Sequence, residues 1–149
     1  MKYILASASP RRKELMTQAG FSFQVVPSQV KETISKTCPS DIVTELSSQK
    51  ALEVYERLQP EDCTVIGADT IVVYRDEILG KPADEAEALD MLSLLAGRTH
   101  QVYTGVTLVR KATSGSRPKI HSFYEKTDVE FYPIHREDLL AYIRTGDPL

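Results

Sequence analysis

The sequence predicts a mixed α/β fold with antiparallel strands in the second half of the chain. In the first half, short apolar runs of β type alternate with segments whose apolar residues have helical spacing. In the second half, residues 101–109 and 120–132 alternate over long stretches. The stretch Thr113-Ser114-Gly115-Ser116 between them is typical of a hairpin loop.

Size, composition and charge restrict the class of protein. The chain has 149 residues, of which 42% are hydrophobic and 26% charged, which is ordinary for one globular domain or two small lobes around a cleft. A chain of this length buries roughly 68–70% of the surface of its unfolded form, so it can build a core without disulfides. The net charge of −3 argues against stable nucleic-acid binding, because no broad basic field is present.

The sequence predicts a cytoplasmic protein without a membrane partner, and it leaves a homodimer open. Cys38 and Cys63 match no zinc-binding spacing and are too few for a disulfide framework, so reduced thiols are expected. The apolar run after the initial methionine is too short for a signal peptide. No stretch approaches the ~20 apolar residues that span a bilayer.

The predicted elements begin with a strand at residues 3–6 and a helix at residues 11–19. Ser9 is a good N-cap for this helix, and Pro10 suits its first position because the missing N–H would have no partner there. Gly20 is expected to end the helix in a left-handed conformation. The remaining predicted elements are a strand at 21–26, an irregular segment at 30–37, a helix from Pro39 to about Leu58, strands at 64–66, 70–74 and 78–79, a helix at 84–96 and a final helix at 136–144.

The first candidate site is the segment Ser7-Ala8-Ser9-Pro10-Arg11-Arg12, which joins a predicted strand to a predicted helix. A helix N-terminus offers unpaired N–H groups and partial positive charge, which favour a phosphate. Arginine adds a planar fork of donors that can bind two phosphate oxygens at once. The alternative is a capped surface helix that carries solvated arginines.

The second candidate is Gly67-Ala68-Asp69-Thr70, whose first three residues are expected to separate the β-type run at 64–66 from the run at 70–74. An acidic residue just past the end of an apolar strand lies where open α/β sheets bind ligands. A carboxylate there can hold Mg²⁺ or accept a proton from water. The alternative is an aspartate that caps a turn.

Two lysines and a glutamate complete the candidate set. Lys50 shares a helical face with Leu46 and Val54, so it must either find an anion or extend its ammonium group into water. Lys81 lies in a constrained Gly-Lys-Pro loop, and Glu32 lies in a polar loop. Each of these residues, taken alone, is more often a solvated surface residue than a functional one.

His100 is expected to be a hydrogen-bonded structural histidine, because no second histidine lies at ligand spacing. The other candidates combine cationic donors and carboxylates from several strand and loop ends. That combination suits a metal-bound polyphosphate, whose charge the cations offset while the carboxylates hold the metal and activate water. The sequence has neither a phosphate-binding Walker A pattern nor a dinucleotide-binding glycine pattern.

In order along the whole chain, these motifs resemble the Maf family, also called septum formation inhibitor Maf-like. The resemblance rests on the opening Ser-x-Ser-Pro-Arg-Arg and the later Gly-Ala-Asp-Thr, together with Glu32, Lys50-Ala51, Gly80-Lys81-Pro82, Arg98-Thr99-His100 and Val102-Tyr103-Thr104-Gly105. It implies hydrolysis of nucleoside triphosphates to a monophosphate and pyrophosphate with Mg²⁺ or Mn²⁺. It also implies an inosine triphosphate pyrophosphatase-like fold, with a mixed twisted sheet, flanking helices and a cleft between two lobes.

The resemblance also implies roles for individual residues. Asp69 would be the proton acceptor and, together with Glu32, a metal ligand. Lys50 and Lys81 would be catalytic residues that hold phosphates. The residues implied to bind substrate are Ser7, Ser9 and Arg11 around the phosphates, and Arg12 and Thr70 for the choice of base.

The branch of the family is suggested by two positions. Relatives that prefer 7-methylguanosine triphosphate have Trp in place of Arg11 and a Ser-Asp-Gln run in place of Ala68-Asp69-Thr70. This chain therefore resembles the dTTP/UTP branch. Family members normally continue past Asp147-Pro148, so residues 1–149 are expected to form a single Maf-like domain of two lobes that lacks the usual C-terminal segment.

Three other functions compete with this one. An inosine or xanthosine triphosphate pyrophosphatase would share the phosphate chemistry but prefer a purine. A non-catalytic nucleotide-binding regulator of septum formation would bind nucleotide without releasing pyrophosphate. A nucleic-acid-binding module is disfavoured by the net charge of −3.

Overall fold

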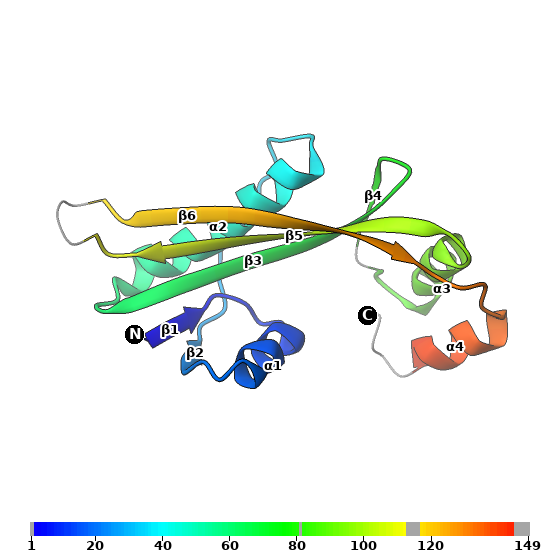
Figure 1. Ribbon diagram of the computed structural model, residues 1–149, viewed down its shortest axis with the longest axis horizontal. Coiled ribbons are helices and arrows are strands. Elements are labelled where there is room, and N and C mark those ends of the chain that lie inside the picture. The colour runs from blue at the N-terminus through cyan, green and yellow to red at the C-terminus, as the bar shows by residue number, and fades with distance from the viewer. Residues whose placement is uncertain (1, 81, 113–116, 145–149) are drawn as a thin grey trace. The chain divides into compact units, whose positions relative to one another are not determined.

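The computed structural model describes residues 2–80, 82–112 and 117–144 of the chain (Figure 1). The predicted hairpin loop at residues 113–116 lies outside these ranges. The elements, in chain order, are β1 (Lys2–Leu5), α1 (Pro10–Gln18), β2 (Phe23–Val25), α2 (Pro39–Leu58), β3 (Cys63–Tyr74), β4 (Glu77–Leu79), α3 (Glu85–Leu95), β5 (Thr99–Arg110), β6 (Lys119–Glu130) and α4 (Arg136–Arg144).

The chain divides into two compact units. Unit 1 comprises the residues up to Thr70 together with Thr104–Glu125, and unit 2 comprises Ile71–Tyr103 and the residues from Lys126 onward. Strands β3, β5 and β6 contribute residues to both units. That residues 1–149 form a single domain of two lobes stays a prediction.

The strands form a mixed sheet in the order β2-β1-β3-β5-β6, with β4 paired to β3. In unit 1, β1 runs parallel to both of its neighbours, and its residues Lys2–Leu5 lie beside Cys63–Ile66 of β3. In unit 2, β3 and β4 are antiparallel, from Val72 opposite Leu79 to Tyr74 opposite Glu77. The predicted mixed α/β class is confirmed.

Helix α1 forms as the sequence predicts. Ser9 is its N-cap, and the Ser9 hydroxyl accepts a hydrogen bond from the backbone N–H of Arg12. Pro10 occupies the first turn, where a missing N–H costs nothing. The helix ends before Gly20, which has a φ of +81° and donates its N–H to the carbonyl of Thr17. These caps fix the direction in which the chain enters and leaves the helix.

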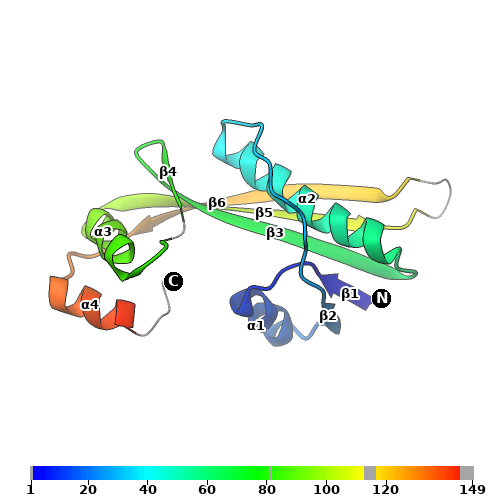
Figure 2. The same ribbon diagram turned by 180° about the vertical axis from the view of Figure 1, so that it is seen from behind.

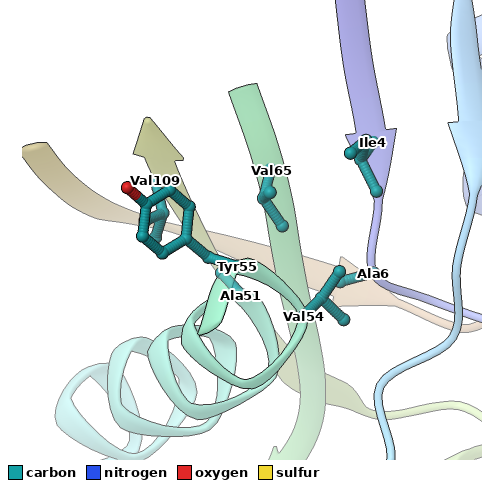
Figure 3. Close-up of a cluster of buried hydrophobic side chains, with 7 residues drawn as sticks. All are labelled: Ile4, Ala6, Ala51, Val54, Tyr55, Val65 and Val109. Carbon is teal, nitrogen blue, oxygen red and sulfur yellow. The ribbon is translucent and has the colours of Figure 1, made fainter. Parts of the chain in front are cut away.

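The core of unit 1 lies between α2 and the sheet (Figure 3). Figure 2 shows α2 lying across one face of β3 and β5. The buried cluster consists of Ile4, Ala6, Ala51, Val54, Tyr55, Val65 and Val109. Full burial of one valine contributes about 1.5–3 kcal/mol, so Val54 of α2, Val65 of β3 and Val109 of β5 anchor the helix to two strands.

Two glycines allow α2 to approach the sheet directly. A Cβ atom on Gly67 of β3 would stand 2.8 Å from the Ala51 backbone nitrogen and 2.9 Å from the Ala51 Cβ. A Cβ atom on Gly105 of β5 would overlap the backbone of Val43 and stand 2.9 Å from the Thr44 nitrogen. No other residue type fits at these two contacts without moving the helix.

The prediction that Gly67-Ala68-Asp69 interrupts the strand is wrong. Strand β3 is continuous from Cys63 to Tyr74. Gly67 is needed because α2 lies against it, and glycine serves there as a contact surface rather than as a turn. The two β-type runs of the sequence are therefore two halves of one strand.

Unit 2 is built from the distal parts of the long strands and two helices that pack on each other, α3 and α4. Asp84 caps α3 by accepting from the Glu87 N–H, while Glu87 accepts from the Ala83 N–H. His100 is buried, its ring packs edge to face on Phe131, and burial lowers its pKa. Its Nδ1 has no hydrogen-bond partner among the described residues, so the expected hydrogen bond is not found there. Packing against Phe131, rather than a hydrogen bond from Nδ1, holds this buried histidine in place.

Within the described ranges, every helix is too short or too polar to cross a lipid bilayer.

Candidate active site

The candidate site lies in unit 1, where β3 extends past the end of β1. Strand β1 ends at Leu5, opposite Ile66, and the N–H of Ala6 donates to the Ile66 carbonyl at 2.8 Å. Beyond that point the chain turns through Ser7 into α1, while β3 continues through Asp69 and Thr70. The carboxyl end of a parallel strand and a helix N-terminus therefore meet beside the Gly67–Thr70 segment.

Arg12 connects the turn after β1 to β3. Its Nη1 donates to the Ser7 hydroxyl at 3.2 Å, and its Nη2 donates to the Thr70 hydroxyl at 2.9 Å. The Thr70 hydroxyl also lies 3.2 Å from that of Thr104 on β5. Burial lowers the pKa of Arg12, and the negative charge of Asp69 partly offsets that effect. The guanidinium is thus fixed in direction by two hydroxyls, with a carboxylate nearby.

Lys50 lies at the centre of a second group of site residues, which also contains Glu32 and Asp69. Its Nζ lies 2.8 Å from Oδ1 of Asp69, 3.2 Å from Oε1 of Glu32 and 3.4 Å from the carbonyl oxygen of Ala68. The exposed fractions of the Lys50 and Asp69 side chains are 18% and 14%, against 46% for Glu32. Lys50 therefore finds anions within the protein, and the alternative of an ammonium group extended into water is wrong.

The position of Lys50 follows from the contact between α2 and β3. Lys50 precedes Ala51, the residue whose backbone nitrogen lies against Gly67. This contact brings the Lys50 side chain over Ala68 and Asp69, the next two residues of the strand. Because Gly67 has no side chain, the ammonium group can reach the strand carboxylate within hydrogen-bond distance.

The loop that carries Glu32 is fastened to α2 on both sides of that residue. Before it, the Ser28 hydroxyl and the Gln29 N–H donate to Glu53. After it, Gln49 bonds the backbone of Thr33, and Glu45 accepts from Ser35.

The anchoring side chains Glu45, Gln49 and Glu53 are spaced by four and therefore lie on one face of α2. A hydrogen bond from Arg57 is the largest cause that lowers the pKa of Glu53 to about 2, and the Gln29 N–H lowers it further. This polar stripe keeps an otherwise irregular loop, and Glu32 with it, close to Lys50.

The structure brings together six of the predicted site residues in unit 1. The other three, Ser9, Arg11 and Lys81, are not part of this group. Those that converge are Ser7, Arg12, Glu32, Lys50, Asp69 and Thr70. The hydroxyl of Ser9 caps α1, and its N–H donates to the Ser7 hydroxyl. The side chain of Arg11 is exposed and makes no hydrogen bond or ion pair within the described ranges. Lys81 lies outside the described residues.

Sequence reasoning missed Thr104 and the stripe of side chains on α2 that holds the Glu32 loop. Thr104 lies in the Val102-Tyr103-Thr104-Gly105 motif, but its role is not predictable from the sequence, because a threonine within an alternating strand carries no distinctive signal. The stripe could have been found from the four-residue spacing of Glu45, Gln49 and Glu53.

The donor set fits a divalent cation in part. Glu32 and Asp69 both reach the same ammonium group, so their oxygens face one position from different elements. Carboxylate oxygens are the ligands that Mg²⁺ and Mn²⁺ prefer. The part of the chain that the structure describes contains no group of three or more His, Cys, Asp and Glu side chains that could hold a metal. Water or ligand oxygens would have to complete such a site.

Comparisons with known proteins relate this chain to one family. The family described as Maf-like protein matches residues 2–149. A dTTP/UTP pyrophosphatase of Agathobacter rectalis is 51% identical over 157 residues, which span 98% of this chain and 76% of that protein. A dTTP/UTP pyrophosphatase of Bacillus cereus is 51% identical over 149 residues, which span 99% of this chain and 70% of that protein.

Solved structures share the fold at low sequence identity. A nucleoside-triphosphatase, or dITP/XTP pyrophosphatase, of Mycobacterium abscessus has a TM-score of 0.54 and 15% identity, and the match covers 87% of this chain and 74% of that one. The Ham1 protein of Staphylococcus aureus has a TM-score of 0.54 and 17% identity, and the match covers 87% and 71% of the two chains. These likenesses confirm the predicted fold class.

Proposed function

This chain belongs to the Maf-like protein family, and we propose that it hydrolyses nucleoside triphosphates between the α- and β-phosphates. The products are a nucleoside monophosphate and pyrophosphate, and the preferred substrates are dTTP and UTP. The names of its relatives at about half identity support this choice. The cytoplasm, which the sequence predicts, is where such an enzyme meets its nucleotide substrates.

The observation that carries the proposal is the position of Lys50 between two carboxylates. The ammonium group lies within 2.8 Å of Asp69 and 3.2 Å of Glu32, beside a guanidinium held by Ser7 and Thr70. A polyphosphate needs cations along its oxygens, and its hydrolysis needs a base for the attacking water. Both kinds of group are present in one small region of unit 1.

Asp69 is proposed to accept the proton of the attacking water. The water oxygen forms a bond to the α-phosphorus, the bond from that phosphorus to the bridging oxygen breaks, and pyrophosphate leaves with the electron pair. The proton released by the water moves to the Asp69 carboxylate. The ion pair with Lys50 and the β3 backbone hold this carboxylate in place before substrate arrives.

Glu32 and Asp69 are proposed to hold a divalent cation, Mg²⁺ or Mn²⁺. Such a cation would polarise the phosphoryl oxygens and offset the charge that develops on them. With two carboxylates from the protein, the remaining ligands would be water and phosphate oxygens, as is usual for Mg²⁺ sites that bind nucleotides. Lys50, which lies beside both carboxylates, would supply positive charge to the phosphate oxygens.

Base choice is proposed to depend on Arg12 and Thr70. The guanidinium and the hydroxyl are fixed against each other at 2.9 Å, so they present a defined set of donors and acceptors. A site built to hydrogen-bond a substrate group rejects analogues that lack it, because its polar atoms are then left unpaired. Lys81, Ser9 and Arg11 are proposed to contact the phosphates on the basis of their motifs alone.

The test is a panel of nucleoside triphosphates assayed for pyrophosphate release, with and without Mg²⁺ or Mn²⁺. The proposal expects dTTP and UTP to be turned over faster than purine nucleotides, and a chelator to abolish release. Preference for ITP or XTP would contradict the pyrimidine assignment. Nucleotide binding without any pyrophosphate release would contradict the enzyme and support a regulatory binding protein.

A further inference from the structure

The connection between β2 and α2, residues 26–38, forms no helix or strand, and it carries Glu32 (Figure 2). Residues 31–38 of this loop are all exposed. Backbone groups in such a segment have no ladder of hydrogen bonds to hold them, so side chains of a neighbouring element must hold them instead. The position of the Glu32 carboxylate therefore depends on what fixes the backbone beside it.

Gln49 of α2 pairs with both backbone groups of Thr33. The Gln49 side-chain oxygen accepts from the Thr33 N–H at 3.1 Å, and its Nε2 donates to the Thr33 carbonyl oxygen at 2.7 Å. A side-chain amide can do this because it carries an acceptor and a donor side by side. A glutamate in its place would set a second oxygen against the Thr33 carbonyl, and an alanine would leave both backbone groups to water.

The peptide group that Gln49 holds is the one that joins Glu32 to Thr33. A peptide group is planar and includes the Cα atoms on both sides, so a fixed Thr33 N–H also fixes the Cα of Glu32. On the helix, Gln49 is followed directly by Lys50, whose Nζ lies 3.2 Å from Oε1 of Glu32. Two consecutive residues of α2 thus hold two consecutive residues of the loop, one through its backbone and the other through its side chain.

The other anchors of this loop lie farther from Glu32. Glu45 and Glu53 accept from backbone N–H groups that lie three residues after and three residues before Glu32, respectively. Three residues of extended chain span about 10 Å, so these two anchors alone would leave Glu32 room to move. In the described part of the chain, Gln49 is the anchor that acts on the peptide group next to Glu32.

We propose that Gln49 is a positioning residue for Glu32 and thereby sets the affinity of this site for a divalent cation. The inference rests on the proposed function, in which Glu32 and Asp69 hold that cation. Asp69 is fixed by β3, whereas Glu32 reaches its place from an irregular loop. Without Gln49, the entropy lost on ordering the loop would have to be offset by cation binding, so the cation would bind more weakly.

Mn²⁺ binding to the wild-type chain without nucleotide tests this role, with free Mn²⁺ followed by electron paramagnetic resonance. Gln49→Ala is expected to raise the dissociation constant about tenfold, the lower end of the range for groups that orient metal ligands. In a Glu32→Gln background the same change is expected to have no further effect, because the ligand that Gln49 positions is gone.

Glu45→Ala is the matched control. It also removes an anchor of this loop from α2, but it leaves the pair of Gln49 with Thr33 in place. The Mn²⁺ dissociation constant of this variant should therefore stay close to that of the wild type. Amide hydrogen exchange at Thr33 reports on the pair itself, and it is expected to be slow in the wild type and in Glu45→Ala but fast in Gln49→Ala.

Pyrophosphate release from dTTP separates this role from a general loss of structure. Gln49→Ala is expected to need about tenfold more Mg²⁺ for half of its maximal rate, and added Mg²⁺ should recover the rate that is lost at low Mg²⁺. A merely destabilised protein would lose rate at every Mg²⁺ concentration. A wild-type chain that releases no pyrophosphate from any nucleoside triphosphate would contradict the proposed function, while Mn²⁺ binding and amide exchange would still decide the role of Gln49.

Several results would overturn the role of Gln49. Wild-type affinity for Mn²⁺ in Gln49→Ala, or an equal loss of affinity in the Glu32→Gln background, would mean that Gln49 does not act through Glu32. An equal loss in Glu45→Ala would assign the effect to the loop as a whole. Fast exchange of the Thr33 amide in the wild type would show that the pair does not form. Mn²⁺ binding that is unmeasurable, or that Glu32→Gln leaves unchanged, would leave Gln49 no ligand to position.

Discussion

Lys50 and Asp69 form an ion pair with 2.8 Å between Nζ and Oδ1, and both side chains are more than four-fifths buried. The pair joins the face of α2 to the middle of β3, and Glu32 contacts the same ammonium group at 3.2 Å. It can form because Gly67 lets the two backbones approach. The proposed chemistry depends on this contact between a helix and a strand.

Replacement of Lys50 by Ala is expected to reduce pyrophosphate release from dTTP by about 10²–10³ in kcat, because it removes a fixed cation at the phosphates. The same change leaves the partly buried Asp69 carboxylate without the Lys50 ammonium group, so the free energy of unfolding should fall by about 1–3 kcal/mol. Lys111→Ala is the control, since its ion pair with Glu61 is exposed. Equal kinetics in the two variants would count against a role for Lys50.

Gly67→Ala is expected to destabilise the protein by about 1–3 kcal/mol, because the new methyl group would force α2 away from β3. The shift would also separate Lys50 from Asp69, so activity should fall more than the loss of folded protein explains. Urea unfolding and kinetics on the folded fraction measure the two effects. For stability, the control is Gly80→Ala, where a Cβ would meet no atom within 4 Å. A Gly67→Ala variant as stable as that control would refute the close contact.

The Glu53 anchor predicts how stability changes in acid. The folded state lowers the pKa of Glu53 to about 2, from 4.5. The stabilisation is therefore fully present above pH 4.5 and is lost as pH falls toward 2. Because the pair with Arg57 lies at the surface, solvent screening keeps its contribution to stability small. Urea unfolding from pH 7 to pH 2 should show the difference between wild type and Glu53→Gln shrinking below pH 4.5. A difference that stays constant over that range would contradict the assignment.

Thr104 is expected to position the pair formed by Arg12 and Thr70. Thr104→Val removes one hydroxyl from this chain of hydrogen bonds. The loss of one hydrogen bond costs about 0.5–1.5 kcal/mol, so kcat/KM for dTTP should fall roughly 2- to 10-fold. Loss of a fixed orientation at Arg12 should also narrow the preference for pyrimidine over purine nucleotides. Thr104→Ser keeps the hydroxyl and should retain both properties. Identical substrate panels for the two variants would show that the hydroxyl has no such role.

Local sequence signals predicted most of the elements of the fold. The Ser9 cap, the Pro10 start and the Gly20 end of α1 follow from side-chain chemistry that acts within a few residues. Gly67 misled the prediction because glycine in a strand signals either a break or a close contact, and only the position of α2 decides between them.

The candidate site could be predicted as a set of residue types but not as an arrangement. The partners Glu32, Lys50 and Asp69 come from a loop, a helix and a strand, and nothing local brings them together. Their meeting depends on α2 lying on β3 and on the side chains that fasten the Glu32 loop to that helix. Thr104 escaped notice for the same reason, since its partner Thr70 is on another strand.

The proton-accepting role of Asp69 is tested most directly by pyrophosphate release from dTTP and UTP in the Asp69→Asn variant. The amide keeps the size of the side chain but cannot take up a proton, so release should fall by about 10²–10⁴ while the variant stays folded. Asp76→Asn, in the exposed turn between β3 and β4, should release pyrophosphate at the wild-type rate. Turnover by Asp69→Asn equal to that of the wild type would contradict the proposed mechanism.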